Sequence, residues 1–159
     1  MPSTSNAFSE AAFDAAIDRT WLRFRCELAD RLDAMRAGHP ITVYALWTEL
    51  LGPQPTIAFS LTGNNRLRLT IATADLFPYG PEDRQRVQLL VGEQWRALHD
   101  ATCIREFARR RVDAAAMAAQ FALREVWDVP DPSYLVADQD RTLHTFITTD
   151  TATREPKMR

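Results

Sequence analysis

Apolar residues recur every three or four positions from Phe13 to Met35, which is the spacing of one helix face. Charged residues such as Asp14 and Asp30 largely occupy the other positions. The pattern predicts one long amphipathic helix. Gly38 and Pro40 should end it, because glycine permits a left-handed backbone and proline cannot continue a helix. The predicted buried face consists of Phe13, Ile17, Trp21, Phe24, Leu28, Leu32 and Met35.

Three stretches after this helix favour strands. Residues 41–47 (ITVYALW) are β-branched and aromatic, and residues 56–62 and 66–73 alternate apolar and polar side chains with a period of two. Residues 63–65 (GNN) between the last two strands tolerate a positive φ and predict a tight hairpin. The hairpin should bury Ile57, Phe59, Leu61, Leu67, Leu69 and Ile71 on one face. The opposite face then carries Ser60, Arg66, Arg68 and Thr70.

The second half of the chain predicts two more helices. Pro81 suits the first position of one, which should turn Val87, Leu90 and Val91 inward and end at Gly92 or continue to residue 98. Residues 99–111 are ambiguous. An alanine-rich helix follows, with the apolar stripe Val112, Ala116, Ala119, Leu123 and Val126.

Two prolines mark the end of the alanine-rich helix. Residues that precede proline avoid the helical backbone, so Pro130 and Pro132 should hold this segment extended. We expect Trp127, Tyr134 and Leu135 to fold back as apolar anchors. Each contributes about 1.5–3 kcal/mol if it is buried.

The order of these elements favours an α+β fold, in which an antiparallel sheet is packed on one face by the long N-terminal helix and the alanine-rich C-terminal helix. We expect a single domain over residues 8–137. Residues 138–159 are polar and threonine-rich, and they predict a C-terminal tail in which residues 143–148 (LHTFIT) could add a short edge strand. We expect the last ten residues to be mobile.

Composition and charge narrow the function classes. Of the 159 residues, 46% are hydrophobic and 25% are charged, an ordinary globular mixture, and the net charge of −2 favours neither nucleic acid nor an anionic membrane. No segment has the length of a signal peptide's apolar region or of a membrane span. Cys26 and Cys103 lie in stretches that we interpret as helical and form no CxxC motif, so we expect free thiols and a cytoplasmic protein.

Candidate catalytic or metal-binding groups are sparse. His39, His99 and His144 are far apart in the sequence and have no histidine or cysteine partner at ligand spacing, so we predict no metal and no other cofactor. Cys103 lies near His99 and allows one alternative, a small-ligand domain or enzyme with a pocket at these residues. No oxyanion loop accompanies the pair, and we therefore predict a protein that is not an enzyme.

The ending of the last helix, residues 123–135 (LREVWDVPDPSYL), carries a family resemblance. Together with the first helix (WLRFRCELADRLDAM) and the hairpin, it resembles YbjN-like proteins and type III secretion chaperones, particularly actinobacterial peptide-binding chaperones, over residues 21–135. One departure is that Gly92 and Trp95 are separated, where the family tends to have adjacent glycine and tryptophan. The resemblance implies a chaperone or adaptor that binds protein or peptide clients without catalysis, and often a homodimer.

Four further residues join the candidate partner-binding set. Arg105 and Arg109 belong to the basic cluster REFARRR, which predicts either a solvated helix face or a docking site for an acidic partner. Met117 and Phe121 lie off the main stripe of the last helix and predict either core or an exposed patch for a partner or second subunit. The exposed sheet face with Ser60, Arg66, Arg68 and Thr70, or an unpaired edge strand, is the other predicted surface for an extended client.

Overall fold

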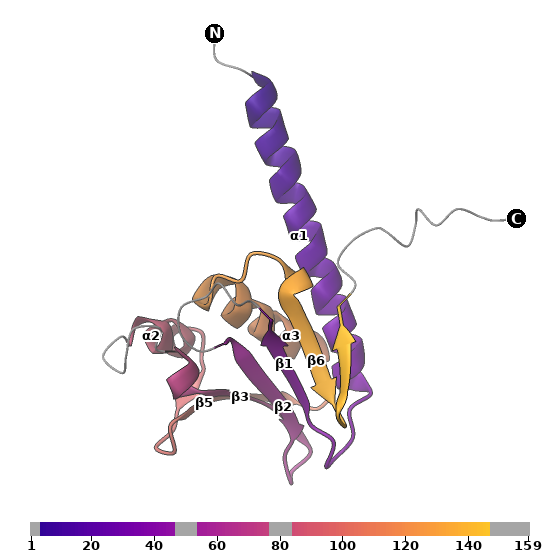
Figure 1. The fold of residues 1–159 in the computed structure, drawn as a ribbon. Helices are drawn as coiled ribbons and strands as arrows, with labels where there is room; N and C mark the ends of the chain where they lie inside the picture. The colour runs from indigo at the N-terminus through magenta and orange to yellow at the C-terminus, as the bar shows by residue number, and fades with distance from the viewer. Residues whose placement is uncertain (1–3, 47–53, 77–83, 147–159) are drawn as a thin grey trace, which may run out of the picture.

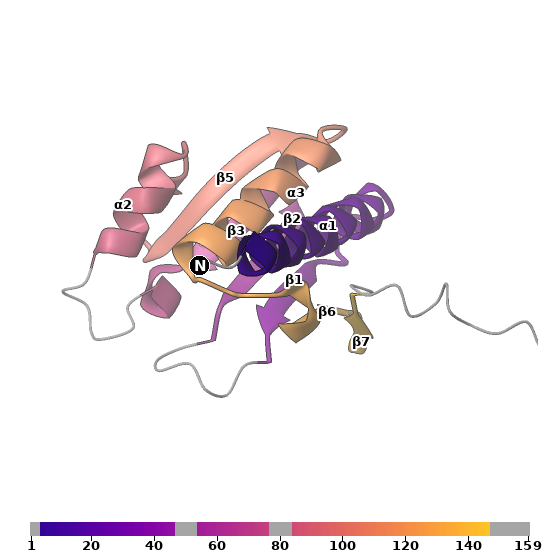
Figure 2. The ribbon, with the colours of Figure 1, turned by 90° about the horizontal axis from the view of Figure 1, so that it is seen from above.

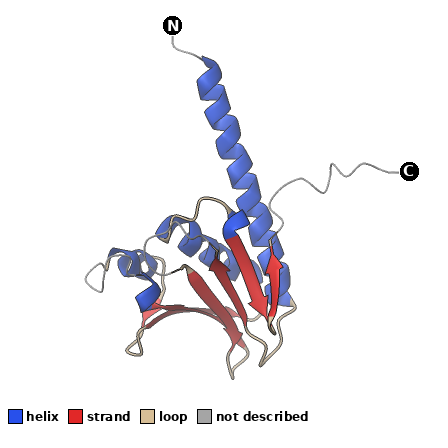
Figure 3. Ribbon diagram, viewed as in Figure 1, coloured by secondary structure: helices blue, strands red, loops and turns tan. Residues whose placement is uncertain are grey.

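The computed structural model describes residues 4–46, 54–76 and 84–146, and the side chains from residue 9 onward within these ranges. Over these residues the fold is a seven-stranded antiparallel sheet. Helices pack against the sheet, as Figures 1 and 3 show. This confirms the predicted α+β class. The predicted start of the second helix at Pro81, the strand end at Trp47 and the last residues of the tail lie outside the described ranges.

The strand order is β4-β5-β3-β2-β1-β6-β7. The strands β2 and β3 pair as a hairpin. The strands β6 and β7 come last in the sequence, but β6 pairs with β1, the first strand, and β7 pairs with β6. The strands are β1 (Ile41–Ala45), β2 (Thr56–Leu61), β3 (Arg66–Ala72), β4 (Arg96–Ala97), β5 (Thr102–Ala108), β6 (Leu135–Gln139) and β7 (Thr142–Thr145).

Two helices lie side by side on one face of the sheet, α1 (Thr4–Asp33) and α3 (Val112–Gln120) (Figure 2). The helix α3 continues as a π-helix, η2 (Phe121–Val126), while α2 (Gln85–Gly92) lies beside β5. Two short 3-10 helices are also present: η1 (Thr73–Leu76) follows β3, and η3 (Pro132–Tyr134) precedes β6. Ala115, Ala116, Ala118 and Ala119 are buried, and their small side chains let α3 approach its neighbours closely.

The predicted buried face of α1 is confirmed from Trp21 to Met35, where every member is at most 3% exposed. It is wrong at Phe13, which is 65% exposed. The reason is visible in Figure 1, where the N-terminal half of α1 projects beyond the sheet and has no layer to pack on. Gly38 follows the helix with a φ of +83°, the left-handed conformation predicted for a helix-ending glycine.

The hairpin is confirmed in position and in facing. Ile57, Phe59, Leu67, Leu69 and Ile71 are fully buried, and Leu61 is partly buried against the same core. The turn places Asn65 at a φ of 57°, and the amide of that residue donates to the carbonyl of Thr62. The strict alternation of side chains therefore fixed both strands and the face that each residue occupies.

The segment of residues 123–135, here called the anchor segment, closes the core at two of the three predicted anchors, and its residues Pro132–Tyr134 form a 3-10 helix where an extended backbone was predicted. Trp127 is 1% exposed, and its indole N–H donates to the carbonyl oxygen of Asp75 at 3.0 Å. Leu135 is fully buried, whereas Tyr134 is 38% exposed and does not serve as a buried anchor. The prediction for Val91 is also wrong: it is 49% exposed at the end of α2, while Val87 and Leu90 face the core.

Three strands were not predicted: β4, which lies where the second helix was allowed to continue to residue 98, and β5 and β6. The residues of β5 were interpreted as ambiguous, and Cys103 was placed in a helix, but they form a seven-residue strand paired with β3 along its whole length. The strand β6 was not predicted because Leu135, Val136 and Ala137 are all buried, which removes the alternation that identifies a half-exposed strand. The edge strand suggested for LHTFIT is present as β7.

Candidate functional site

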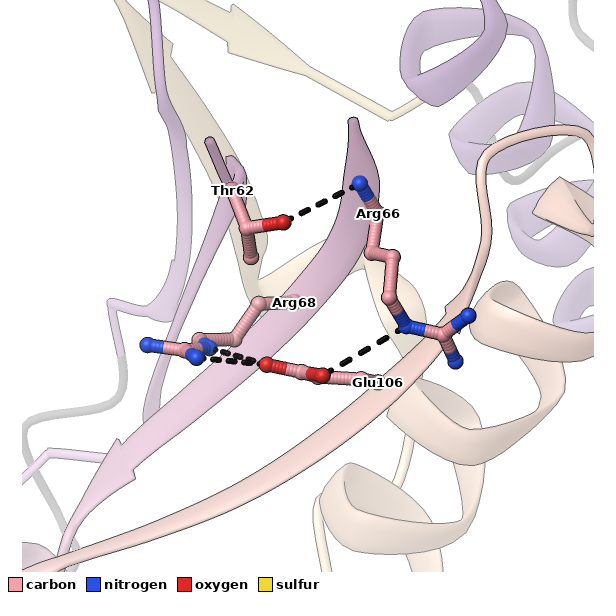
Figure 4. Close-up of polar contacts among 4 residues, drawn as sticks. All are labelled: Thr62, Arg66, Arg68 and Glu106. Atoms are coloured by element: carbon pink, nitrogen blue, oxygen red, sulfur yellow. Dashed lines mark hydrogen bonds and ion pairs between the residues drawn. The ribbon is translucent and has the colours of Figure 1, made fainter. Parts of the chain in front are cut away.

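The face of the sheet that points away from α1 and α3 carries a small charge network (Figure 4). Register places Glu106 of β5 directly opposite Arg68 of β3. Arg68 Nε donates to Glu106 Oε2 at 2.7 Å, and Arg66 Nε lies 3.5 Å from Glu106 Oε1. One carboxylate therefore interacts with two guanidinium groups and partly neutralises the positive charge of Arg66 and Arg68.

The electrostatics of Glu106 follow from these contacts. The hydrogen bond from Arg68 is the main cause that lowers the pKa of the Glu106 carboxyl below its ordinary value of 4.5. Partial burial raises the pKa, and the charges of Arg68, Arg66 and Arg96 lower it further. The carboxylate stays ionised at neutral pH and holds Arg68 in place on the sheet.

The outer edge of β5 is only partly paired. The two-residue strand β4 pairs with Ile104 and Cys103, and the amide of Leu98 donates to the carbonyl of Thr102. The backbone groups of Thr102 therefore face β4, and the two-residue period of a strand turns those of Glu106 and Ala108 to the same side. No strand in the described part of the chain pairs with β5 there. We call residues 105–108 the β5 edge.

A hollow of about 470 Å³ opens beside the β5 edge. Four arginines and one glutamate line it, which gives this hollow a formal excess of three positive charges. No hydrogen bond or ion pair of the side chains of Arg96 and Arg111 is found among the described residues. The full lining is Arg66, Gln94, Arg96, Arg105, Glu106, Phe107, Ala108 and Arg111.

A second hollow, of about 380 Å³, lies on the helix side of the same edge, between β5 and α3. Its lining is largely apolar, and it shares Arg105, Phe107 and Arg111 with the first hollow. Arg105 stacks over the ring of Phe107 at 4.8 Å and donates to the carbonyl of Glu93 at 2.8 Å. The other lining residues are Glu93, Trp95, Ala114, Met117, Ala118 and Phe121.

The structure brings together half of the residues that the sequence proposed for partner binding. Arg66, Arg105, Met117 and Phe121 line the two hollows at the β5 edge. Ser60 and Thr70 lie on the exposed sheet face, opposite Arg68 and Ile104 respectively.

Arg109 lies apart from both hollows and interacts with the end of α1. Its Nη2 donates to the carbonyls of Asp33 at 3.0 Å and Met35 at 2.9 Å, where it satisfies backbone groups left open at the helix end. This contact fixes the turn after β5 against α1. The basic cluster is therefore not a helix face: Arg105 lies on the helix side of a strand, and Arg109 lies in the following turn.

The sequence did not single out Arg96, Glu106 and Phe107 as members of a site, and it included Arg111 only as part of the basic cluster. Phe107 and Glu106 are adjacent in β5, so their side chains point to opposite faces of the sheet. An alternation of apolar and polar residues across residues 102–108 could have identified this strand. The adjacent apolar residues Cys103 and Ile104, which are both buried, interrupt that alternation.

The geometry does not support the alternative pocket at Cys103 and His99. Cys103 is fully buried on the core face, where burial raises the pKa of its thiol, the opposite of what activates a nucleophile. His99 is exposed in the turn between β4 and β5, and neither residue lines the hollows described above.

Within residues 4–46, 54–76 and 84–146, no group of three or more histidine, cysteine, aspartate or glutamate side chains could hold a metal ion. No helix in these ranges combines the length and apolar character needed to cross a bilayer.

Comparison with protein families identifies the chain. Residues 14–141 match the family described as "T3SS (YopN, CesT) and YbjN peptide-binding chaperone 3". The chain belongs to this family of peptide-binding chaperones. The match covers the strands β1 to β6 and most of α1, and it ends just before β7. The resemblance to YbjN-like and type III secretion chaperones noted from the sequence is thereby confirmed. No curated protein and no solved structure matches the chain.

Proposed function

We propose that this chaperone holds its client by adding an extended client segment to the β5 edge. The observation that carries the proposal is the outward backbone of Glu106 and Ala108, which lies between two hollows and has no partner strand among the described residues. Addition of a strand supplies main-chain hydrogen bonds that do not depend on sequence, and the flanking hollows supply selectivity.

Two features favour the β5 edge over the centre of the exposed sheet face. In the middle of the sheet, the backbone groups of β3 and β2 are already paired on both sides, so a client there could make only side-chain contacts. Arg68, the central charge of that face, is held by Glu106. Arg66 is common to both surfaces, because it lines the hollow at the edge.

We also propose that the chain acts without catalysis or a cofactor, as an adaptor or chaperone. The burial of Cys103 supports this, since a protonated, inaccessible thiol is a poor nucleophile. The cytoplasmic location predicted from the free cysteines stays a prediction, as does the single-domain boundary at residues 8–137.

A homodimer likewise stays a proposal. The surface available to a second copy lies between α1 and α3, where a shallow hollow of about 280 Å³ is lined by Leu22, Arg25, Cys26, Asp113 and Met117. Leu22 and Met117 are 48% and 50% exposed. Light scattering of the wild type and of Leu22→Arg would test it: the dimer proposal expects twice the monomer mass for the wild type only.

The edge proposal can be tested with a neutral extended probe. The hexapeptide Ser-Thr-Val-Thr-Val-Ser is titrated into the isotope-labelled chain, and backbone amide shifts are followed by nuclear magnetic resonance. The proposal expects the largest shifts at Glu106, Ala108 and the neighbouring residues of β4 and α3. Shifts centred on β7 or on the exposed sheet face would contradict it.

Two N-methylated versions of the probe provide the matched control. Alternate amides of an added strand point toward the protein, and the others point to solvent. Methylation of one alternating set should abolish binding, while methylation of the other set should leave it. Equal binding of both versions would show that the contact does not use main-chain hydrogen bonds, and would overturn strand addition.

A further inference from the structure

The two sides of the β5 edge differ in chemistry, and an added strand would contact both of them. Side chains of a strand alternate between the two faces of its sheet, so one set of client residues would lie on the helix side and the other on the exposed side. On the helix side the neighbours are Phe107, Met117 and Phe121. On the exposed side they are Arg66 and Arg96, with Glu106 shared between Arg68 and, more distantly, Arg66.

The length of the edge is limited at both ends. At Ile104 the strand β4 occupies the outer side of β5, with Arg96 opposite that residue. At the other end the chain turns back toward α3, where the amide of Arg111 donates to the carbonyl of Ala108 at 2.9 Å. About four client residues therefore fit as a paired strand, two facing each side.

From this arrangement we infer that the β5 edge selects extended segments in which acidic and apolar residues alternate. Carboxylates on one side of the client strand would meet Arg66 and Arg96, and apolar side chains on the other side would enter the hollow at Met117 and Phe121. The inference rests on the proposed strand addition and names the class of segment that this edge prefers. The same composition in a different order should bind less well, because it cannot place each kind of residue on its own side.

The first experiment compares two probes of identical composition. Ser-Glu-Leu-Glu-Leu-Ser alternates, whereas Ser-Glu-Glu-Leu-Leu-Ser does not, and both carry blocked termini so that the charge resides in side chains alone. Fluorescence anisotropy of labelled probes gives the dissociation constants. We expect the alternating probe to bind at least about threefold more tightly, the scale of one exposed charge pair together with apolar contact.

Protein variants then separate the two sides of the edge. Arg96→Gln should weaken the alternating acidic probe about threefold and leave the neutral probe Ser-Thr-Val-Thr-Val-Ser unchanged, because it removes only an exposed charge. Met117→Gln should weaken both probes, since both place apolar residues on the helix side. Arg36→Gln is the matched control, because Arg36 is exposed in the segment after α1 and does not line either hollow. Higher salt should reduce the preference for the acidic probe.

The outcomes distinguish this inference from the function on which it rests. If the alternating and non-alternating probes bind equally at the β5 edge, strand addition stands and the alternation is overturned. If no probe, including the neutral one, shifts the amides of Glu106 and Ala108, strand addition itself falls. A loss of acidic-probe affinity in Arg36→Gln as large as in Arg96→Gln would show that the charge effect is general and would also overturn the inference.

Discussion

The anchor segment and the β5 edge differ in whether their polar groups find partners within the chain. In the anchor segment the polar groups are satisfied internally: the amide of Trp127 donates to Ala122, that of Val129 to Leu123, and the indole of Trp127 to Asp75. At the β5 edge, the outward backbone of Glu106 and the outward amide of Ala108 have no partner strand among the described residues. The side chains of Arg96 and Arg111 line the hollow beside them and form no hydrogen bond or ion pair in the described part of the chain. The first region should govern stability, and the second should govern recognition.

The strongest test of this contrast is removal of the Trp127 ring. Trp127→Ala leaves a cavity and an unpaired carbonyl at Asp75, so we expect the free energy of unfolding to fall by about 3–5 kcal/mol. Trp127→Phe keeps most of the apolar contact and should cost less, about 1–3 kcal/mol. Chemical denaturation followed by circular dichroism measures both. A wild-type denaturation midpoint in Trp127→Ala would show that the anchor segment does not hold the core.

Arg109 tests how sharply the two regions are separated, because it directly follows the β5 edge. Its two hydrogen bonds to the end of α1 are partly exposed, so Arg109→Ala should lower the free energy of unfolding by about 1–2 kcal/mol. Binding of the neutral probe should persist at temperatures where the variant is folded. Arg110→Ala, at an exposed neighbour, should change stability by less than about 0.5 kcal/mol. Similar losses in both variants would contradict the assigned role of Arg109.

The smallest expected effect concerns the carboxylate that holds Arg68. A lowered pKa in the folded state means that Glu106 contributes stability above its ordinary pKa of 4.5 and loses it as the pH falls through the folded value. The pair is partly exposed, so Arg68→Gln should cost less than about 1 kcal/mol at neutral pH. The cost should shrink as the pH falls below 4.5. Urea denaturation at a series of pH values tests this, and a cost independent of pH would exclude the carboxylate as its source.

The sequence predicted those regions whose structure is determined by residues close together in the chain. The hairpin was recognised because Ile57, Phe59, Leu67 and Leu69 alternate with polar residues around a turn that tolerates positive φ. The anchor segment was recognised because two prolines must end a helix wherever they occur. Each inference needed only neighbouring residues, and the structure confirmed the elements.

The β5 edge could not be predicted in the same way, because its properties depend on pairing between distant residues. Glu106 neutralises Arg68 only because the register brings together residues 38 positions apart. The edge is open only because β4 is two residues long and ends opposite Ile104. Phe13 shows the same limit on a helix: its apolar spacing was correct, but the sheet does not reach it.

Hydrogen exchange of two backbone amides tests the central claim most directly. The amides of Glu106 and Ala108 face outward from β5, so they should exchange rapidly in the free chain and slow down when Ser-Glu-Leu-Glu-Leu-Ser is bound. The amides of β7, at the other edge of the sheet, serve as the internal reference and should not change. Slowing at Glu106 and Ala108 alone is the predicted result. Slowing confined to β7, or none at either edge while the probe is bound, would contradict the account.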